Sequence, residues 1–198
     1  DTIESTPLES LSTIITSARN AQKSWAKLEV SQRVQMLERV YQAFDQAHES
    51  LAVSLASEMG MPIRQARDEV QYGMMYFRWY LDHADEHLTP EITRETEQEL
   101  HIVTHEPHGV VVAIAPWNYP FSMMIWTCMQ ALLAGNSVIF KTSKECILTG
   151  KLIDDLICST SLPDHVWTEI YGNGALGDAI VRENIDFITF TGSTRVGQ

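Results

Sequence analysis

Apolar residues recur at helical spacing through the first half of the chain, between about residues 8 and 88. Two stripes of such residues define the first helices: Leu11, Ile14, Ile15 and Ala18, and then Val34, Leu37, Val40, Tyr41 and Phe44. Ser31 is placed to cap the second helix at its start. A third helix near Leu51–Met59 should end at Gly60, and a fourth is predicted over Ile63–His87.

The pattern changes after residue 90, where short apolar runs alternate with helical segments. The predicted strands are Leu100–Glu106, Val110–Ala115, Ser137–Phe140, Val166–Tyr171 and Phe187–Phe190, and the predicted helices between them are Phe121–Ala134, Leu148–Ser159 and Asp178–Glu183. The uninterrupted apolar run at 110–115 is typical of a strand buried on both faces. We therefore predict an α/β fold, in which N-terminal helices (1–89) precede a Rossmann-like parallel sheet with helices on both faces (90–198).

Composition narrows the class of protein. An apolar fraction of 44% and a net charge of −12 fit a globular protein and argue against a nucleic-acid surface. No apolar run approaches the roughly 18 residues of a membrane helix. Cys128, Cys146 and Cys158 show no CxxC pairing, so we expect reduced thiols in the cytoplasm rather than disulfides or a zinc site. His83 and His87 lie four residues apart among acidic neighbours, so we expect a solvated surface and no metal site there.

The residues that follow each strand are the candidates for function, because ligands of parallel sheets bind at the carboxyl ends of the strands. Asn118 follows the strand at 110–115 and lies between two prolines that fix the backbone. A side-chain amide held in this way can donate a hydrogen bond to an oxygen that gains negative charge during a reaction. The alternative is that Asn118 caps the next helix.

The next buried strand is followed by Lys141, Thr142, Ser143 and Lys144. A lysine and two hydroxyl groups at the end of a strand can hydrogen-bond a sugar or a phosphate. The alternative for this segment is a solvated loop without a ligand.

Glycine-containing turns follow the last two strands. The segment from Gly172 to Gly177, with Gly174 between them, has the GxGxxG spacing but does not follow the first strand as a dinucleotide fingerprint should. After the last strand, Gly192 lets the backbone approach a ligand closely, and Ser193 precedes a helix start where free N–H groups favour phosphate. All four strand ends should lie at the same edge of the sheet.

Three segments together resemble motifs of the aldehyde dehydrogenase superfamily in order and spacing. They are Ile114-Ala-Pro-Trp-Asn-Tyr-Pro-Phe121, Lys141 at the next strand end, and Phe190-Thr-Gly-Ser-Thr-Arg-Val-Gly197. The resemblance covers essentially the whole chain, because the N-terminal helices and Glu58-Met-Gly-Met-Pro62 are also similar to the family's. It implies that residues 1–198 are the N-terminal NAD(P)-binding domain of such an enzyme, with an incomplete sheet and no catalytic domain.

The resemblance also implies a reaction, in which a cysteine thiolate attacks an aldehyde, hydride passes to the nicotinamide, and the thioester is hydrolysed. Trp117 and Asn118 would flank the nicotinamide, and the Asn118 amide would stabilise the oxyanion. The family's general-base glutamate, in a Glu-Leu-Gly-Gly motif, and its nucleophilic cysteine do not occur in this chain. Cys128 and Cys146 are not in the nucleophile's sequence context. We therefore expect the chain alone to be inactive.

The resemblance assigns the cofactor, NAD or NADP, to the strand-end residues. Lys141 would hold the adenosine ribose, Gly192 and Ser193 would hold the pyrophosphate, and the turn at Gly174 would border the adenosine.

Lys144 bears on which of the two cofactors is bound. In the family, the residue three positions after the ribose lysine faces the ribose hydroxyls, and NAD-preferring members commonly carry glutamate there. A lysine would attract a 2′-phosphate, and Thr142 and Ser143 add donors in the same loop, which favours NADP. Glu145 would restore the usual repulsion if it turned inward.

Within the family, Glu58-Met-Gly-Met-Pro62 followed by Ala66–Val70 looks most like succinate-semialdehyde dehydrogenases, which implies succinate semialdehyde as the aldehyde substrate. The family resemblance also implies a full-length homodimer or homotetramer. One alternative is a nucleotide-binding or scaffolding module that has lost catalysis. Another is a reductase relative that releases acyl-phosphate or acyl-CoA, against which the intact Pro116-Trp117-Asn118 argues. A gene that continues into Glu-Leu-Gly-Gly and a cysteine motif would separate an enzyme from a module.

Overall fold

The computed structural model describes residues 3–197. Its first half is helical, as predicted: a short turn η1 (Leu8–Ser10) precedes α1 (Leu11–Trp25), α2 (Val30–Gln46), α3 (His48–Met59) and α4 (Ile63–Leu88). Gly60 ends α3 in the left-handed region, at φ 67°, where glycine has no steric penalty. The start of α2 differs from the prediction that Ser31 caps it. Glu29 is the N-cap residue, and its N–H donates to Gln32 Oε1 (3.0 Å).

Four parallel strands form the central sheet: β3 (Val110–Ile114), β4 (Ser137–Lys141), β5 (Trp167–Ile170) and β6 (Phe187–Phe190). Their order across the sheet is β5-β4-β3-β6. Ile114 lies opposite both Lys141 and Phe190, and Lys141 lies opposite Ile170. The carboxyl ends of the four strands are therefore level, and the loops that follow them share one edge of the sheet.

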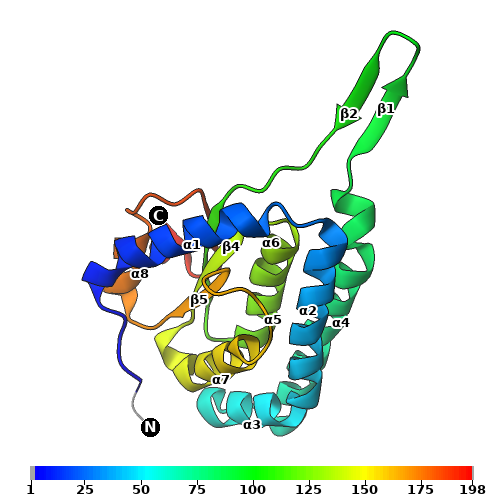
Figure 1. Cartoon of the computed structure of the whole chain (residues 1–198). Helices are drawn as coiled ribbons and strands as arrows, with labels where there is room; N and C mark the ends of the chain where they lie inside the picture. The colour runs from blue at the N-terminus through cyan, green and yellow to red at the C-terminus, as the bar shows by residue number, and fades with distance from the viewer. Residues whose placement is uncertain (1–2, 198) are drawn as a thin grey trace.

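Helices cover both faces of this sheet (Figure 1), which confirms the predicted α/β architecture. Successive strand residues point to opposite faces, so the two faces build separate cores. Val110 belongs to a buried cluster with α1 and α8 (Gly174–Ile180). Val111 belongs to a larger cluster with α2, α3, α4 and α7 (Ile147–Cys158). A short turn η3 (Lys144–Cys146) precedes α7, and α9 (Thr194–Gly197) follows β6.

The single helix predicted over Phe121–Ala134 is one helical run of three segments. These are α5 (Pro120–Met124), a π-helical turn η2 (Ile125–Met129) and α6 (Gln130–Leu133). Pro120 occupies the first turn, where the missing N–H of proline costs nothing. π-Helical turns are rare and often lie near functional sites.

A hairpin interrupts the order that the sequence predicted. β1 (Glu91–Glu95), which was not predicted, pairs antiparallel with β2 (Leu100–Val103), and the predicted strand Leu100–Glu106 is correspondingly too long. Both strands are exposed along their whole length and belong to a separate two-stranded sheet. The hairpin extends away from the rest of the molecule (Figure 1).

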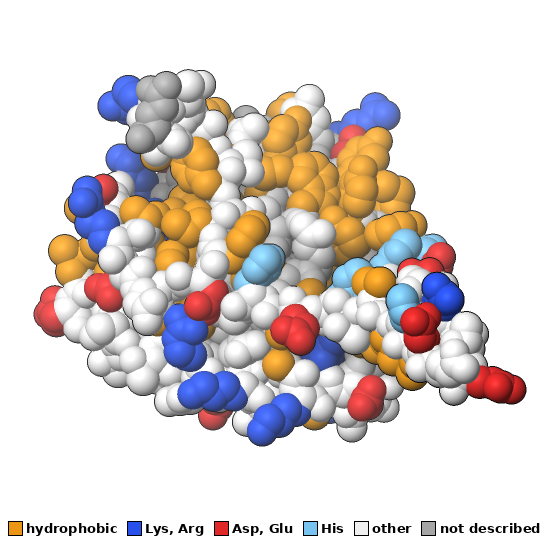
Figure 2. Space-filling model, turned by 90° about the horizontal axis from the view of Figure 1, so that it is seen from above, with side chains coloured by type: hydrophobic (Ala, Val, Ile, Leu, Met, Phe, Trp, Pro, Cys, Tyr) orange, Lys and Arg blue, Asp and Glu red, His pale blue; other side chains and the backbone are white. Residues whose placement is uncertain are grey.

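Hydrophobic side chains gather along one side of the molecule seen from above, with histidine side chains next to them (Figure 2). The exposed apolar residues of the chain include Phe187, Ile188 and Phe190 of β6 and Trp79 of α4. Strand β6 is an edge of the sheet, so beyond its pairing with β3 it has no neighbouring strand among residues 3–197 to cover its exposed side.

Candidate functional site

The loops that follow the four parallel strands meet at one edge of the sheet. Asn118 follows β3, Lys141 ends β4, Gly174 follows β5 and Gly192 follows β6. The structure thus brings together strand-end segments that are more than 70 residues apart in the chain, as parallel strands require.

Asn118 is exposed in the loop between β3 and α5, and its side chain has no hydrogen-bond partner within residues 3–197. The N-cap residue of α5 is Tyr119, so the interpretation of Asn118 as a helix cap is wrong. Trp117, its neighbour, is 54% exposed. Both side chains are accessible to a ligand.

The first turn of α5 is satisfied by Glu69 of α4. Glu69 Oε1 accepts from the backbone N–H groups of Phe121 (3.1 Å) and Ser122 (3.3 Å). The Ser122 hydroxyl donates to the backbone oxygen of Glu69 (3.2 Å). Glu69 is 3% exposed, and its Oε2 has no partner in the described part of the chain. Burial raises the pKa of Glu69 to about 7, because the two N–H bonds offset the loss of hydration only in part. Glu69 therefore fixes the backbone that carries Asn118.

Glu69 was not among the functional residues predicted from the sequence. Its signal was an acidic side chain within the buried stripe of a predicted helix, beside Val70 and between Ala66 and Gly73. A carboxylate at such a position needs a partner, because burial of an unpaired charge is costly. The sequence could not say that the partner is the start of α5.

Lys141 is 6% exposed at the end of β4. Its Nζ donates to the backbone oxygen of Thr142 (3.3 Å), the one hydrogen bond of this ammonium among the described residues. Burial lowers the pKa of Lys141. Its side chain passes close to α8, since a Cβ at Gly177 would lie 3.6 Å from the Lys141 Cε. An ammonium group has three donors, so Lys141 keeps donors for a ligand.

The other residues predicted to bind the cofactor in this loop, Thr142, Ser143 and Lys144, differ in their exposure and contacts. Thr142 is buried, and its Oγ1 lies 3.6 Å from Cys146 Sγ, so its hydroxyl faces the interior. Ser143 Oγ accepts from the N–H of Glu145 (3.4 Å). Lys144 is exposed, with its Nζ 3.2 Å from Glu145 Oε1. Glu145 therefore pairs with Lys144 in this structure.

The N-terminus of α7, like that of α5, is bound by a glutamate carboxylate. Glu58 of α3 accepts from the N–H of Leu148 through Oε1 (2.8 Å) and from the N–H of Thr149 through Oε2 (2.6 Å). A carboxylate at a helix N-terminus is stabilised by the helix dipole and takes the place that an anionic ligand would need.

The start of α8 lies at Gly174, four residues before the predicted Asp178. The reason is that Asn173 Oδ1 accepts from the N–H of Ala175 (2.9 Å) and so caps the helix early. A Cβ added at Gly174 would meet nothing within 4 Å, so the space outside this turn is open.

Gly192 lies in the loop between β6 and α9. A Cβ at Gly192 would lie 2.5 Å from the ring Cζ of Phe190, so a larger residue would have to displace that ring. Ser193 is exposed directly before α9, and its backbone oxygen accepts from the N–H of Val196 (3.0 Å).

The three cysteines are free. Burial raises the pKa of the Cys146 thiol to about 11 and raises that of Cys128 further. Burial and the neighbouring Asp154 also raise the pKa of Cys158. All three thiols are therefore protonated near neutral pH, which is not the environment of a catalytic nucleophile.

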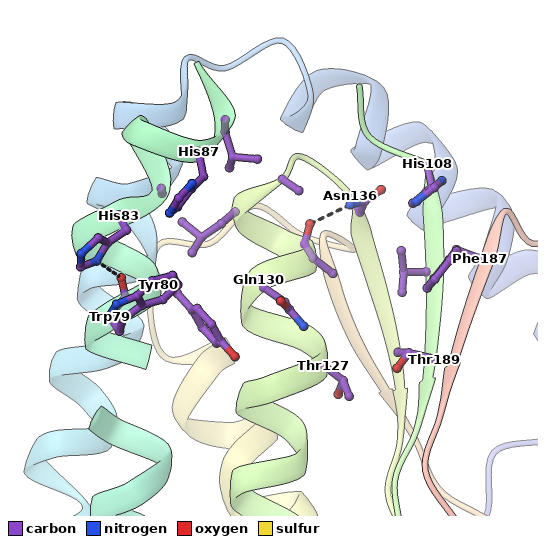
Figure 3. Close-up of a pocket in the computed structure, with 16 residues that line it drawn as sticks. Trp79, Tyr80, His83, His87, His108, Thr127, Gln130, Asn136, Phe187 and Thr189 are labelled. Atoms are coloured by element: carbon purple, nitrogen blue, oxygen red, sulfur yellow. Dashed lines mark hydrogen bonds between the residues drawn. The ribbon is translucent and has the colours of Figure 1, made fainter. Parts of the chain in front are cut away.

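Two cavities lie at opposite ends of the sheet. One, of about 740 Å³, lies beside Asn118, and its lining comes from α4, the loop after β3 and the helical run that follows. The other, of about 540 Å³, is shown in Figure 3, where Trp79 and His83 of α4 lie across from His108 and Phe187. His108 precedes β3 and Phe187 begins β6, so this second cavity is at the amino ends of the strands. The cavity beside Asn118 is therefore the candidate site.

Within residues 3–197, no helix has the length and apolar character needed to cross a membrane. The same residues contain no group of three or more His, Cys, Asp or Glu side chains that could hold a metal ion.

Residues 2–198 match the model of the aldehyde dehydrogenase family. The chain is 35% identical over 177 residues to the NADP/NAD-dependent aldehyde dehydrogenase PuuC of Escherichia coli, covering 88% of this chain and 36% of that protein. It is 33% identical to a protein of Sinorhizobium fredii named "probable succinate-semialdehyde dehydrogenase [NADP(+)]", covering 90% and 37%. A crystal structure from Burkholderia cenocepacia, provisionally assigned as an aldehyde dehydrogenase, superposes with a TM-score of 0.92 at 29% identity, covering 100% of this chain and 42% of that one.

Proposed function

This chain belongs to the aldehyde dehydrogenase family, and we propose that it is the part of an NAD(P)-dependent enzyme that binds the cofactor and supplies one catalytic group. The chain spans about two fifths of the length of the relatives it matches. The whole protein would oxidise an aldehyde to a carboxylic acid. The observation that carries this proposal is the meeting of four strand-end loops at one edge of the sheet, beside Asn118 and its cavity.

The polar groups at this edge fit a dinucleotide. The Lys141 ammonium keeps donors for the adenosine ribose hydroxyls. The N-termini of α5 and α7 already hold the carboxylates of Glu69 and Glu58, so a pyrophosphate would not bind there. The loop at Gly192 and Ser193 contains no acidic residue, and its backbone N–H groups would hold the pyrophosphate.

The nicotinamide, when bound, supplies the hydride acceptor, and Trp117 and Asn118 would lie beside it. The free Asn118 amide would donate a hydrogen bond to the oxyanion of the substrate. The backbone that carries it is held by Glu69, so little reorganisation would be needed during the reaction. The adenosine would border Gly174, where space is open.

We propose that the whole enzyme accepts NADP at least as well as NAD. Lys144 is exposed at this edge and would attract a 2′-phosphate. Its pairing with Glu145 reduces that attraction only slightly, because exposed ion pairs are worth ~0–1 kcal/mol. Ser143 remains available as a donor, whereas the buried Thr142 hydroxyl does not contribute.

The sequence motif around Glu58 and the cavity beside Asn118 point to different substrates. The motif around Glu58 favours succinate semialdehyde, which carries a carboxylate. The cavity beside Asn118 does not support this choice, because no lysine or arginine of residues 3–197 lines it. An anionic substrate would need such a partner.

The assembly and compartment of the whole protein are part of the proposal. The projecting hairpin and the exposed edge of β6 offer surfaces for a homodimer or homotetramer. Free, mostly buried thiols fit a reducing compartment, and we propose the cytoplasm.

The proposal is tested first by titrating NAD and NADP into the 198-residue chain in a calorimeter. We expect binding, and Lys141→Met should weaken it about 10- to 100-fold, since hydrogen bonds from charged groups are worth ~1.5–3 kcal/mol. Lys27→Met, at an exposed position of the helical half, is the matched control. A chain that binds neither cofactor would contradict the proposal.

The second test is activity. The chain alone should turn over no aldehyde, because it has neither the Glu-Leu-Gly-Gly motif nor a cysteine that forms a thiolate. Turnover that survives replacement of all three cysteines by serine would contradict this expectation. A gene that continues into those motifs, with activity in the longer product, would separate an enzyme from a non-catalytic nucleotide-binding module.

A further inference from the structure

The cavity beside Asn118 is an aromatic vestibule with acidic side chains. Its volume of about 740 Å³ is in the range of small-molecule sites. Five aromatic side chains line it: Tyr72, Tyr76, Trp117, Tyr119 and Trp126. They come from α4, from the loop after β3 and from η2. Tyr76 and Trp126 meet edge to face, with ring centroids 5.4 Å apart, so two sides of the vestibule are in contact.

The charged side chains that line the vestibule are acidic. Asp68 and Glu69 line the cavity, and no lysine or arginine of the described chain does. Asp68 is exposed and forms no ion pair within residues 3–197. The nearby Arg67 is bound to Glu49 through two hydrogen bonds of 2.9 and 2.6 Å, so its charge is already paired. A cation that enters the cavity therefore meets the Asp68 carboxylate and no positively charged side chain of residues 3–197.

Glu69 gives a second, independent indication that the cavity favours a positively charged group. It is 3% exposed, it lines the cavity, and its Oε2 has no hydrogen-bond partner in the described chain. Its other oxygen already holds the start of α5. Oε2 itself is shielded from solvent, so its effect on a molecule in the cavity is through the electrostatic field, and a carboxyl group with an incompletely compensated charge is stabilised by a positive group nearby.

We infer that this vestibule selects aldehydes that carry a cationic nitrogen, so that the substrate class is an amino or quaternary-ammonium aldehyde rather than a carboxylate-bearing one. The inference rests on the proposed aldehyde dehydrogenase function. Aromatic faces attract organic cations through their quadrupoles, and several rings around one ammonium group form a cage. Asp68, which is exposed, adds a negative charge to the lining. The aldehyde carbon would then reach toward Asn118, which lines the same cavity.

The inference is tested on the 198-residue chain with a pair of probes of the same shape. Choline carries a trimethylammonium group, and 3,3-dimethylbutan-1-ol carries an uncharged tert-butyl group in its place. Binding is measured by quenching of tryptophan fluorescence, since Trp117 and Trp126 lie in the cavity. We expect choline to bind at least about tenfold more tightly, which corresponds to ~1.4 kcal/mol. Equal affinities would overturn the inference.

Variants connect the selectivity to the cavity. Asp68→Asn should reduce the preference for choline to within about threefold, and Tyr72→Leu, which keeps an apolar side chain, should also reduce it. Both residues are exposed, so the fold should tolerate the changes. Asp85→Asn, an exposed position on the same helix outside this cavity, is the matched control and should keep the preference. A preference that survives both cavity variants would overturn the inference.

The activity of the longer gene product separates this inference from the proposed function. The aldehydes to be compared in the assay are betaine aldehyde, the neutral isostere 3,3-dimethylbutanal, and succinate semialdehyde. Oxidation with the highest kcat/KM for betaine aldehyde supports both. Oxidation with equal or higher kcat/KM for either of the others overturns the inference and leaves the proposed function standing. If no aldehyde is oxidised, the proposed function fails, and the choline measurement still decides whether the vestibule selects cations.

Discussion

Replacement of Glu69 by glutamine should make the protein more stable above neutral pH. The carboxyl is buried, and its pKa rises from the ordinary 4.5 to about 7 because burial disfavours the charged form. A group whose folded pKa is raised contributes stability that is complete below its unfolded pKa of 4.5. That stability is lost as the pH rises through about 7. Glutamine stays neutral and keeps an oxygen that accepts from Phe121 and Ser122.

The magnitude follows from the two pKa values. Each unit of difference corresponds to about 1.4 kcal/mol, so a rise from 4.5 to about 7 makes ionised Glu69 cost about 3 kcal/mol of folding free energy above pH 8. Part of this loss has already occurred at pH 5, where the unfolded carboxyl is mostly ionised. Between pH 5 and pH 8 we therefore expect Glu69→Gln to gain about 2–3 kcal/mol relative to the starting protein.

The assay is urea unfolding of both proteins at pH 5 and pH 8, with the free energy of unfolding taken from linear extrapolation. Other titrating groups, including the buried Glu169, contribute equally to both proteins and cancel in the difference. Glu86→Gln, an exposed position on the same helix, is the control and should show no such dependence on pH. A difference between Glu69→Gln and the starting protein that stays constant with pH would refute the reasoning.

Four further predictions follow from individual contacts. Glu169→Met should raise the free energy of unfolding by about 1–3 kcal/mol in urea titrations, because neither carboxyl oxygen of this buried residue has a hydrogen-bond partner among residues 3–197 and burial raises its pKa well above the ordinary value. Gly73→Ala should lower it by about 1–3 kcal/mol, because the new Cβ would lie 2.7 Å from the Phe121 ring; unchanged stability would contradict that close packing. In the longer gene product, Asn118→Ala should slow turnover about 10²–10³-fold with cofactor affinity nearly unchanged, as for loss of one oxyanion donor, and near-normal turnover would remove that role. Lys144→Glu should shift the ratio of kcat/KM for the two cofactors toward NAD, and an unchanged ratio would show that Lys144 does not face the 2′ position.

Some features of the site could not be predicted from the sequence, because they depend on contacts between segments that are far apart in the chain. That Glu69 and Glu58 occupy two helix starts depends on α3 and α4 packing against α7 and α5, more than 50 residues away. The pairing of Lys144 with Glu145 and the inward turn of Thr142 depend on side-chain orientations that residue types do not specify. The aromatic vestibule likewise combines residues from segments that are far apart in the chain.

The sequence alone predicted the four parallel strands, the helices between them and the polar residues that follow each strand. Apolar runs such as 110–114 predict buried strands because every backbone group of a central strand is paired and both faces are covered. The position of Asn118 and Lys141 follows, since parallel strands end at one edge. Two features depended on the tertiary structure: the exposed hairpin and the burial of Glu69. The hairpin at Glu91–Val103 has no buried face, so it left no hydrophobic pattern to predict its first strand. Glu69 is buried because the free N–H groups of α5 need an acceptor, and that need exists only once the two helices are packed together.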